Sequence, residues 1–196
     1  MRAMRIAMGF PTADRPVIAA LYWEAFGGKL GRALGPRDKA LRFIEGVLSP
    51  GHAICAWDDG GRLLGVAGFK TYEGSLVGGD FADMARVYGW VGATWRLGLL
   101  ALLSRDTDNV RFLMDGIFVA PEARGRGVGT LLLDAIAEEA RSRGYREVRL
   151  DVVEGNARAR ALYERKGYEP VARHSTGLLR YVFGFDAATT MILRLS

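Results

Sequence analysis

The segment that decides the fold of this chain reads Val119-Ala120-Pro121-Glu122-Ala123-Arg124-Gly125-Arg126-Gly127-Val128-Gly129-Thr130. A β-rich run leads into it, and an amphipathic helix is expected to leave it over residues 126–143. The start of this helix carries Gly127 and Gly129 where acidic residues are usually preferred. Glycines let a ligand approach the unpaired amides of a helix start, and the helix dipole there favours negative charge. With Arg124 and Arg126 beside them, these residues predict an anion-binding site.

Two familiar phosphate motifs fit the segment poorly. A Walker loop needs a Lys directly after its last glycine, and no Lys stands near this loop. A dinucleotide fingerprint needs G-x-G-x-x-G immediately after a strand, whereas the spacing here is G-x-G-x-G and five residues separate Val119 from Gly125. Asp151, at the end of a later strand, resembles a ribose-binding acid, so a dinucleotide site remains the weaker alternative.

A third motif fits every position. Residues 124–129 match the R/Q-x-x-G-x-G/A pattern of acyl-CoA binding, and a V-x-P step precedes them at Val119. Downstream, the pattern N-A-x-x-x-x-L-Y-x-x-x-G-[YF] is met at Asn156, Ala157, Leu162, Tyr163, Gly167 and Tyr168. Together these motifs resemble the GNAT superfamily of acyl-CoA-dependent N-acetyltransferases. The resemblance covers about residues 110–171, near a third of the chain.

The resemblance implies an α/β GNAT fold across one domain, residues 1–196: a mostly antiparallel central sheet with a splayed parallel strand pair, flanked by helices. Apolar periodicity predicts a helix over 13–26 ended by Gly27 and Gly28, a second helix over 37–48, and a hairpin formed by 52–57 and 62–71. The strand at 110–119 and the strand at 147–153 would form the splayed pair.

The resemblance also assigns cofactor-binding roles. The strand residues Ile117, Phe118 and Val119 would pair through their backbone with the pantetheine arm of acetyl-CoA, and an amide near Val119 would hold the oxyanion. The residues that would bind the pyrophosphate are Arg124, Gly125, Arg126, Gly127, Val128, Gly129 and Thr130. Asn156 would cap the next helix and touch the pantetheine arm.

Two residues are candidates for catalysis. Tyr163 matches the family's tyrosine near the acetyl sulfur, where a phenol can protonate the leaving thiolate. Asp115 is the first candidate for the general base, because period-2 counting places it on the face of Ile117 and Val119. Glu154 and Glu24 are weaker candidates, and a bound water is a further option.

An inserted helix is expected at about 81–105, apolar on most of its surface. Its 87–104 stretch carries a single charge, Arg96, which makes a buried or interface helix the better interpretation than a membrane span. Tyr88, Trp90 and Trp95 would line an acceptor pocket, form a homodimer face or pack in the core.

Composition narrows the partners. The chain has 196 residues and a net charge of +5, and 23 of its 27 cationic side chains are Arg. These arginines are spread along the chain rather than gathered in a stripe with aromatic residues, so nucleic acid is not expected as a partner. The lone Cys55 provides neither a disulfide nor a cysteine zinc site, no metal is expected, and the two histidines lack spaced partners. With no recognisable signal peptide, a cytoplasmic location is expected.

The sequence therefore predicts an enzyme that transfers the acetyl group of acetyl-CoA to a primary amine by direct attack in a ternary complex. The alternative is a non-catalytic acyl-CoA sensor on the same fold. The acceptor amine, the general base, the oligomeric state and the role of the 81–105 helix are left open.

Overall fold

The computed structural model describes residues 4–103, 110–177 and 184–195. Within them lies an eight-stranded sheet in the order β1-β2-β3-β5-β6-β8-β7, with β4 paired to β3. In chain order the elements are β1 (Met4–Met8), η1 (Thr12–Asp14), α1 (Arg15–Leu34), α2 (Arg37–Val47), η2 (Pro50–His52), β2 (Ala53–Asp58), β3 (Leu63–Thr71), β4 (Gly74–Ser75), α3 (Phe81–Leu103), β5 (Phe112–Val119), η3 (Pro121–Ala123), α4 (Val128–Ser142), β6 (Glu147–Val153), α5 (Ala157–Arg165), β7 (Glu169–Ser175) and β8 (Ala187–Arg194). Described strand neighbours are antiparallel except β5 and β6, which run parallel. The predicted fold class is confirmed.

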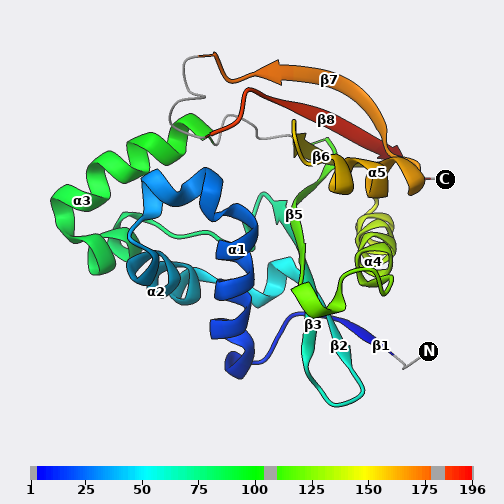
Figure 1. Cartoon of the computed structure of the whole chain (residues 1–196), viewed down its shortest axis with the longest axis horizontal. Helices are drawn as coiled ribbons and strands as arrows, with labels where there is room; N and C mark the ends of the chain where they lie inside the picture. The colour runs from blue at the N-terminus through cyan, green and yellow to red at the C-terminus, as the bar shows by residue number, and fades with distance from the viewer. Residues whose placement is uncertain (1–3, 104–109, 178–183, 196) are drawn as a thin grey trace.

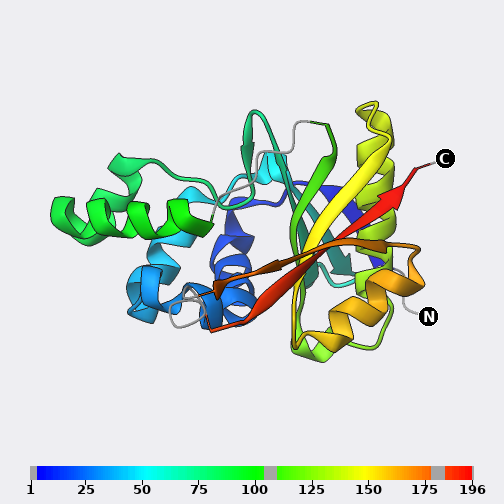
Figure 2. The ribbon, with the colours of Figure 1, turned by 90° about the horizontal axis from the view of Figure 1, so that it is seen from above.

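Two layers of helices enclose the sheet. Helices α1, α2 and α3 lie on one side of it, and α4 and α5 lie on the other, as Figures 1 and 2 show. Each side has its own apolar core: Leu132 and Ile136 of α4 are buried in one, and Ile18 and Ile44 of α1 and α2 are buried in the other. The sheet must therefore be apolar on both faces, and β3 is buried along most of its length.

Helix α4 forms where the sequence predicts it, with slightly shorter ends. Val128, Leu132, Ile136 and Ala140 recur every four residues, and all four are buried against the sheet. Gly144, at φ +80°, follows its end as a left-handed stop. The strong period of this segment is why its helix could be predicted from sequence.

Helix α1 is longer than predicted. It continues through Gly27 and Gly28 to Leu34, so the expected stop at these glycines is wrong. Ala33 and Leu34 are buried, and the Leu34 carbonyl accepts a hydrogen bond from the Tyr88 hydroxyl of α3. Packing of this last turn against α2 and α3 offsets the weak helix propensity of glycine, which is a cost of about 1 kcal/mol per residue.

The expected helix at 81–105 is present as α3 but is not continuous. Gly89 adopts φ +73° and ψ 166°, which breaks α3 into two helical pieces. Only glycine reaches this conformation without strain. The predicted end at Arg105 lies outside the described residues, and no helix in the described ranges is long and apolar enough to cross a membrane.

Candidate active site

The loop between β5 and α4 leaves backbone amides open at the helix start. Gly125 and Gly127 have φ +80° and +85°, and Gly127 is the N-cap residue of α4. The first helical bond runs from the Leu131 amide to the Gly127 carbonyl, at 3.1 Å. The amides of residues 128–130 come before it, the N-cap residue Gly127 gives them no side-chain cap, and the first turn holds no acid. This is an anion-binding helix start, as the sequence predicts.

The parallel strands β5 and β6 separate directly beside this loop. They pair only through Phe112 with Val148 and Leu113 with Arg149. Beyond Leu113, β5 pairs with β3 on its other edge and has no described strand partner toward β6. The two strands thus splay, which leaves main-chain groups of β5 available to a ligand.

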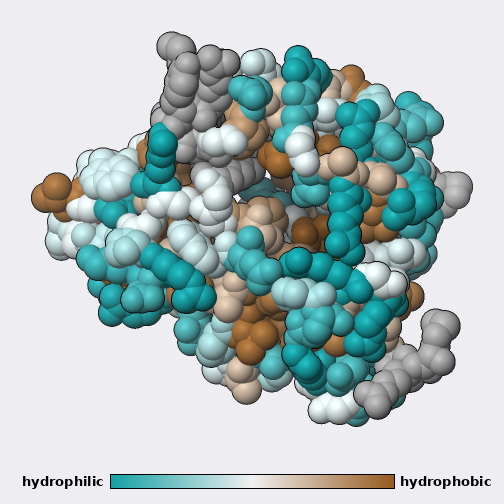
Figure 3. All heavy atoms as spheres, viewed as in Figure 1, coloured by the Kyte–Doolittle hydropathy of each residue, from teal (hydrophilic) through white to brown (hydrophobic). Residues whose placement is uncertain are grey.

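A pocket of about 550 Å³ occupies this opening. It is lined by Leu21, Ala25, Phe26, Ile117, Phe118, Val119, Ala123, Arg124, Gly125, Gly127, Val128, Gly129, Thr130, Asn156, Arg158, Ala159, Leu162, Tyr163 and Arg165. Figure 3 shows the surface hollowed between α1 on one side and α4 and α5 on the other, with apolar side chains inside and hydrophilic ones at the rim. The pocket size and its mixed lining suit one elongated small molecule.

Most of the predicted cofactor residues meet in this pocket. All three strand residues, Asn156, Tyr163 and the loop residues line it, with Arg126 as the exception. Arg126 is exposed and lies outside the pocket lining. Its place in the motif therefore does not by itself bring its guanidinium to the ligand.

Arg124 lines the pocket but is held by protein groups. Its Nη2 donates to Glu24 Oε1 of α1 at 3.0 Å, and its Nε donates to the Val119 carbonyl at 3.2 Å. Arg124 thereby ties the end of β5 to α1. Because Glu24 offsets its charge, Arg124 contributes less positive potential to the pocket than the sequence suggests.

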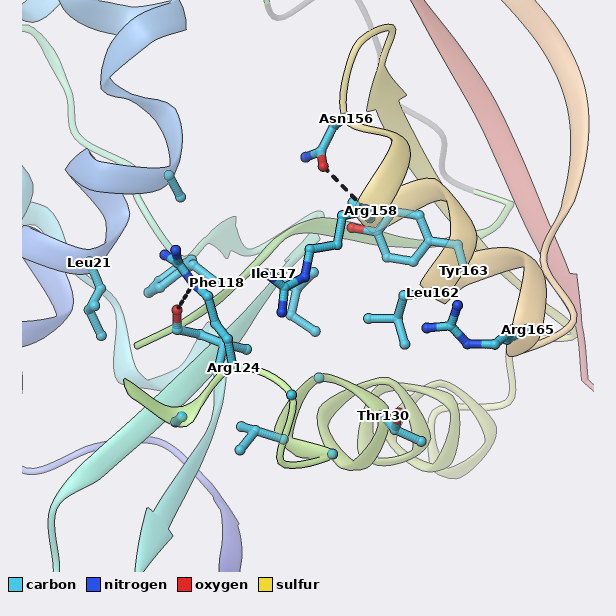
Figure 4. Close-up of a pocket in the computed structure, with 18 of the residues that line it drawn as sticks. Leu21, Ile117, Phe118, Arg124, Thr130, Asn156, Arg158, Leu162, Tyr163 and Arg165 are labelled. Carbon is cyan, nitrogen blue, oxygen red and sulfur yellow. Dashed lines mark hydrogen bonds between the residues drawn. The ribbon is translucent and has the colours of Figure 1, made fainter. Parts of the chain in front are cut away.

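Tyr163 of α5 lines the pocket, and Figure 4 shows its hydroxyl end pointing toward the side chain of Arg158. Its side chain is largely buried, and burial raises the pKa of its phenol to about 12. The centroids of the Tyr163 and Tyr168 rings lie 5.9 Å apart, so the two rings pack against each other. A phenol with this pKa stays protonated at neutral pH, so its hydroxyl proton is present when a ligand binds.

Asn156 is the N-cap of α5. Its Oδ1 accepts a hydrogen bond from the Ala159 amide at 3.1 Å, and the residue also lines the pocket. The cap uses the oxygen, which leaves the side-chain amide nitrogen on the pocket side in Figure 4. Capping and ligand contact are thus compatible in one residue.

Asp115 does not lie where period-2 counting puts it. Gly68 and Phe69 are consecutive in β3, yet they pair with Gly116 and Met114 of β5. Asp115 is therefore an extra residue of β5 between these two pairs, and β5 forms a bulge there. Met114, Ile117 and Val119 consequently share the α4 side of the sheet. The prediction that Asp115 shares the face of Ile117 and Val119 is wrong, because one inserted residue reverses the alternation.

The charge of Asp115 affects a side chain on the α1 side of the sheet, Tyr22. Burial, and secondarily the charge of Asp115, raise the pKa of Tyr22 on α1. The Tyr22 ring lies edge-on to Phe118 at 5.8 Å, on the same side. Asp115 is exposed and is not among the pocket-lining residues.

The weaker base candidates are engaged in ion pairs. Glu24 binds Arg124, as described above. Glu154 accepts bonds from Nε and Nη2 of Arg173, and these bonds lower the pKa of the Glu154 carboxyl. A carboxylate held ionised in this way is a poor proton acceptor.

Sequence reasoning missed one wall of the pocket and one of its arginines. Leu21, Ala25 and Phe26 come from α1, more than 90 residues before the glycine loop, and carry no motif. Arg165 lies seven residues after Arg158, a spacing that places both on one face of α5. That spacing was the available signal for the arginine.

Helix α3 contributes no residue to the pocket lining. Tyr88 is buried and packs against Phe43, while Trp90 and Trp95 are 76% and 48% exposed. In Figure 1, α3 lies at the far edge of the molecule from α4 and α5. The predicted packing role fits Tyr88, and the two tryptophans stay unassigned.

Comparison with known proteins agrees with this geometry. The family model described as the acetyltransferase (GNAT) family matches residues 16–168. The chain belongs to this family and is an acyltransferase of the GNAT type. Among curated proteins, none matches the chain significantly.

Solved structures show the same fold. An N-acetyltransferase from Staphylococcus aureus Mu50 has a TM-score of 0.65 at 16% identity, over 96% of this chain and 100% of that one. The putative acetyltransferase yncA from Salmonella typhimurium, solved with acetyl-CoA, has a TM-score of 0.61 at 19% identity, over 99% and 95%. An agmatine N-acetyltransferase mutant has a TM-score of 0.62 at 18% identity, over 98% and 99%. At these identities the likeness concerns the fold.

Proposed function

We propose that this chain, acting as a single domain, transfers the acetyl group of acetyl-CoA to a primary amine by direct attack in a ternary complex. The observation that carries the proposal is the pocket in the β5–β6 splay, which joins an open helix start to the Tyr163 phenol. Family membership supports acetyl-CoA as the co-substrate. The neighbour solved with acetyl-CoA has the same fold.

The residues present suit acetyl-CoA. At Gly125 and Gly127 an added Cβ would meet only open space, so the backbone there is accessible to a pyrophosphate. The open amides of residues 128–130 would hold that pyrophosphate, and the open edge of β5 would pair with the pantetheine arm. Ile117 and Leu162 supply apolar walls for the arm.

In the proposed reaction, the amine nitrogen attacks the thioester carbonyl carbon and a C–N bond forms. The amide near Val119 stabilises the oxyanion, the C–S bond breaks, and Tyr163 donates its hydroxyl proton to the departing thiolate. The proton lost by the amine goes to a base, for which Asp115 or a bound water is proposed, and it returns through solvent to the Tyr163 phenolate, which restores the enzyme. Products are the acetamide and CoA.

Thermal unfolding with separate ligands tests the co-substrate. At a hundredfold excess over Kd, acetyl-CoA should add about 2.7 kcal/mol to the unfolding free energy. NAD and ATP should add far less. No shift at millimolar acetyl-CoA would remove the proposal.

Thiol release across a panel of amines tests catalysis. The panel should include polyamines, agmatine, amino acids, aminoglycosides and peptides with free N-termini or lysines. Release of CoA thiol with at least one amine supports the enzyme. Tight acetyl-CoA binding with no release from any amine favours the non-catalytic sensor instead.

A further inference from the structure

Helix α5 and the residue directly after it carry four cationic side chains whose surroundings differ. Arg160 donates to Glu164 at 2.8 Å, and the side chain of Lys166, directly after the helix, is paired with Asp134 of α4. Arg158 and Arg165 have no ion-pair partner in the part of the chain that the structure describes, and both line the pocket. The two cations of this group that line the pocket are therefore the two that have no described ion-pair partner.

The two free arginines flank the open start of α4. An added Cβ on Gly129 would lie 3.0 Å from Cδ2 of Leu162, so α5 packs closely on the first turn of α4. Arg158 lies four residues before Leu162 and Arg165 three residues after it, which puts all three on one helix face. In Figure 4 Arg158 extends over the pocket and Arg165 lies at the Thr130 end.

CoA has two phosphate-bearing groups, and the glycine loop can bind only one of them. The amides of residues 128–130 suit the pyrophosphate, and the other charged group of CoA is the 3′-phosphomonoester on its ribose. Two guanidiniums on one helix face, about 10 Å apart along the axis, can fork onto a single phosphate with their long side chains.

We propose that Arg158 and Arg165 bind the ribose 3′-phosphate and make the enzyme select CoA over dephospho-CoA. This inference rests on the proposed function, because it concerns the same pocket. It assigns to α5 a selectivity that the glycine loop cannot supply, since the loop meets groups that both ligands share.

Calorimetric titration with CoA and with dephospho-CoA tests the assignment. The wild-type protein should bind CoA about tenfold to a hundredfold more tightly, the effect of one or two charge-assisted hydrogen bonds. In Arg158→Gln and Arg165→Gln this ratio should fall severalfold, and in the double variant it should approach one. Arg160→Gln, on the same helix but paired with Glu164, is the matched control and should keep the wild-type ratio.

The outcomes separate two failures. If neither ligand binds the wild-type protein, the proposed function fails. If both bind equally well, the function stands and the 3′-phosphate assignment is overturned. If the Arg→Gln variants weaken both ligands by the same factor, the arginines contact the pyrophosphate instead, which also overturns the assignment.

Discussion

The two sides of the pocket are built in different ways. The β5–α4–β6–α5 side presents backbone amides, Asn156 and Tyr163, all within about 60 residues of one another in sequence. The α1 side presents Leu21, Ala25 and Phe26, which carry no chemistry beyond their apolar surface. The first side can be recognised from its motifs, because backbone geometry requires particular residues. The second is shaped by packing, which many residues can satisfy.

The largest expected effect is on kcat, and it should distinguish Tyr163 from Tyr168, the two tyrosines of the downstream motif. Tyr163→Phe should lower kcat roughly a hundredfold, the lower end for proton transfer, with the Kd for acetyl-CoA unchanged. Tyr168→Phe is the control, since the buried Tyr168 hydroxyl has no hydrogen-bond partner among the described residues and its loss should cost neither activity nor stability. Steady-state kinetics and calorimetry on both variants check this. Unchanged turnover in Tyr163→Phe would exclude it from the mechanism.

The next largest effect is expected on acetyl-CoA affinity, from substitution of the two glycines at the ends of α4. Gly127→Ala and Gly144→Ala each place a Cβ at positive φ, and each should destabilise the fold by about 1–2 kcal/mol. Only Gly127→Ala should also weaken acetyl-CoA binding, by about tenfold or more, because its Cβ enters the pocket. Chemical denaturation and calorimetry measure the two quantities. Equal binding by both variants would contradict the loop as the ligand cradle.

The pH profile tests the proton donor. Because the pKa of Tyr163 is raised to about 12, its phenol remains protonated where an ordinary tyrosine, with a pKa of about 10, would ionise. The kcat profile should therefore show no fall between about pH 9 and pH 11 from loss of this proton. A descending limb centred near pH 10 that disappears in Tyr163→Phe would show an unshifted phenol.

A substitution of Asp115, which lies on the α1 side of the sheet, tests which group acts as the general base. If Asp115 is the base, Asp115→Asn should lower kcat by about a hundredfold and remove an ascending limb of the pH profile. If a bound water takes the proton, the variant should keep both. The first result assigns the base to Asp115 and the second excludes it, and acetyl-CoA affinity should be unchanged because Asp115 lies outside the pocket lining.

The smallest effect is expected on α3. Trp90→Ser should leave acetyl-CoA affinity and kcat within twofold, because α3 is remote from the pocket. Sedimentation velocity on the wild type and this variant tests the homodimer that the exposed tryptophans suggest. A wild-type dimer that the substitution dissociates would assign this face to self-association, and a wild-type monomer would dismiss it.

Most of the fold could be predicted from local signals. The β2–β3 hairpin and helices α2 and α4 lie close to their expected ranges, because their apolar periods and turn residues agree with the final packing. The errors lie where tertiary contacts overrode a local rule. Glycines 27 and 28 did not end α1, since Leu34 is buried farther on, and Gly89 did break α3.

The candidate site likewise contains residues that local sequence predicts and residues whose positions depend on tertiary contacts. Tyr163 and the glycine loop could be proposed from spacing, whereas the position of Asp115 could not, because a bulge depends on pairing with β3. Arg126 resembled a phosphate ligand in sequence but lies outside the pocket lining.

By itself the sequence determined the glycine loop, the helix that follows it and the motif that ends in Tyr168, because main-chain conformation there depends on local residue choice. Only the tertiary structure decided which charges remain free at the pocket. Arg124 is paired with Glu24 from a helix 100 residues away, while Arg158 and Arg165 are not paired within the described residues. Charge compensation is set by distance in space, which spacing along the chain does not encode.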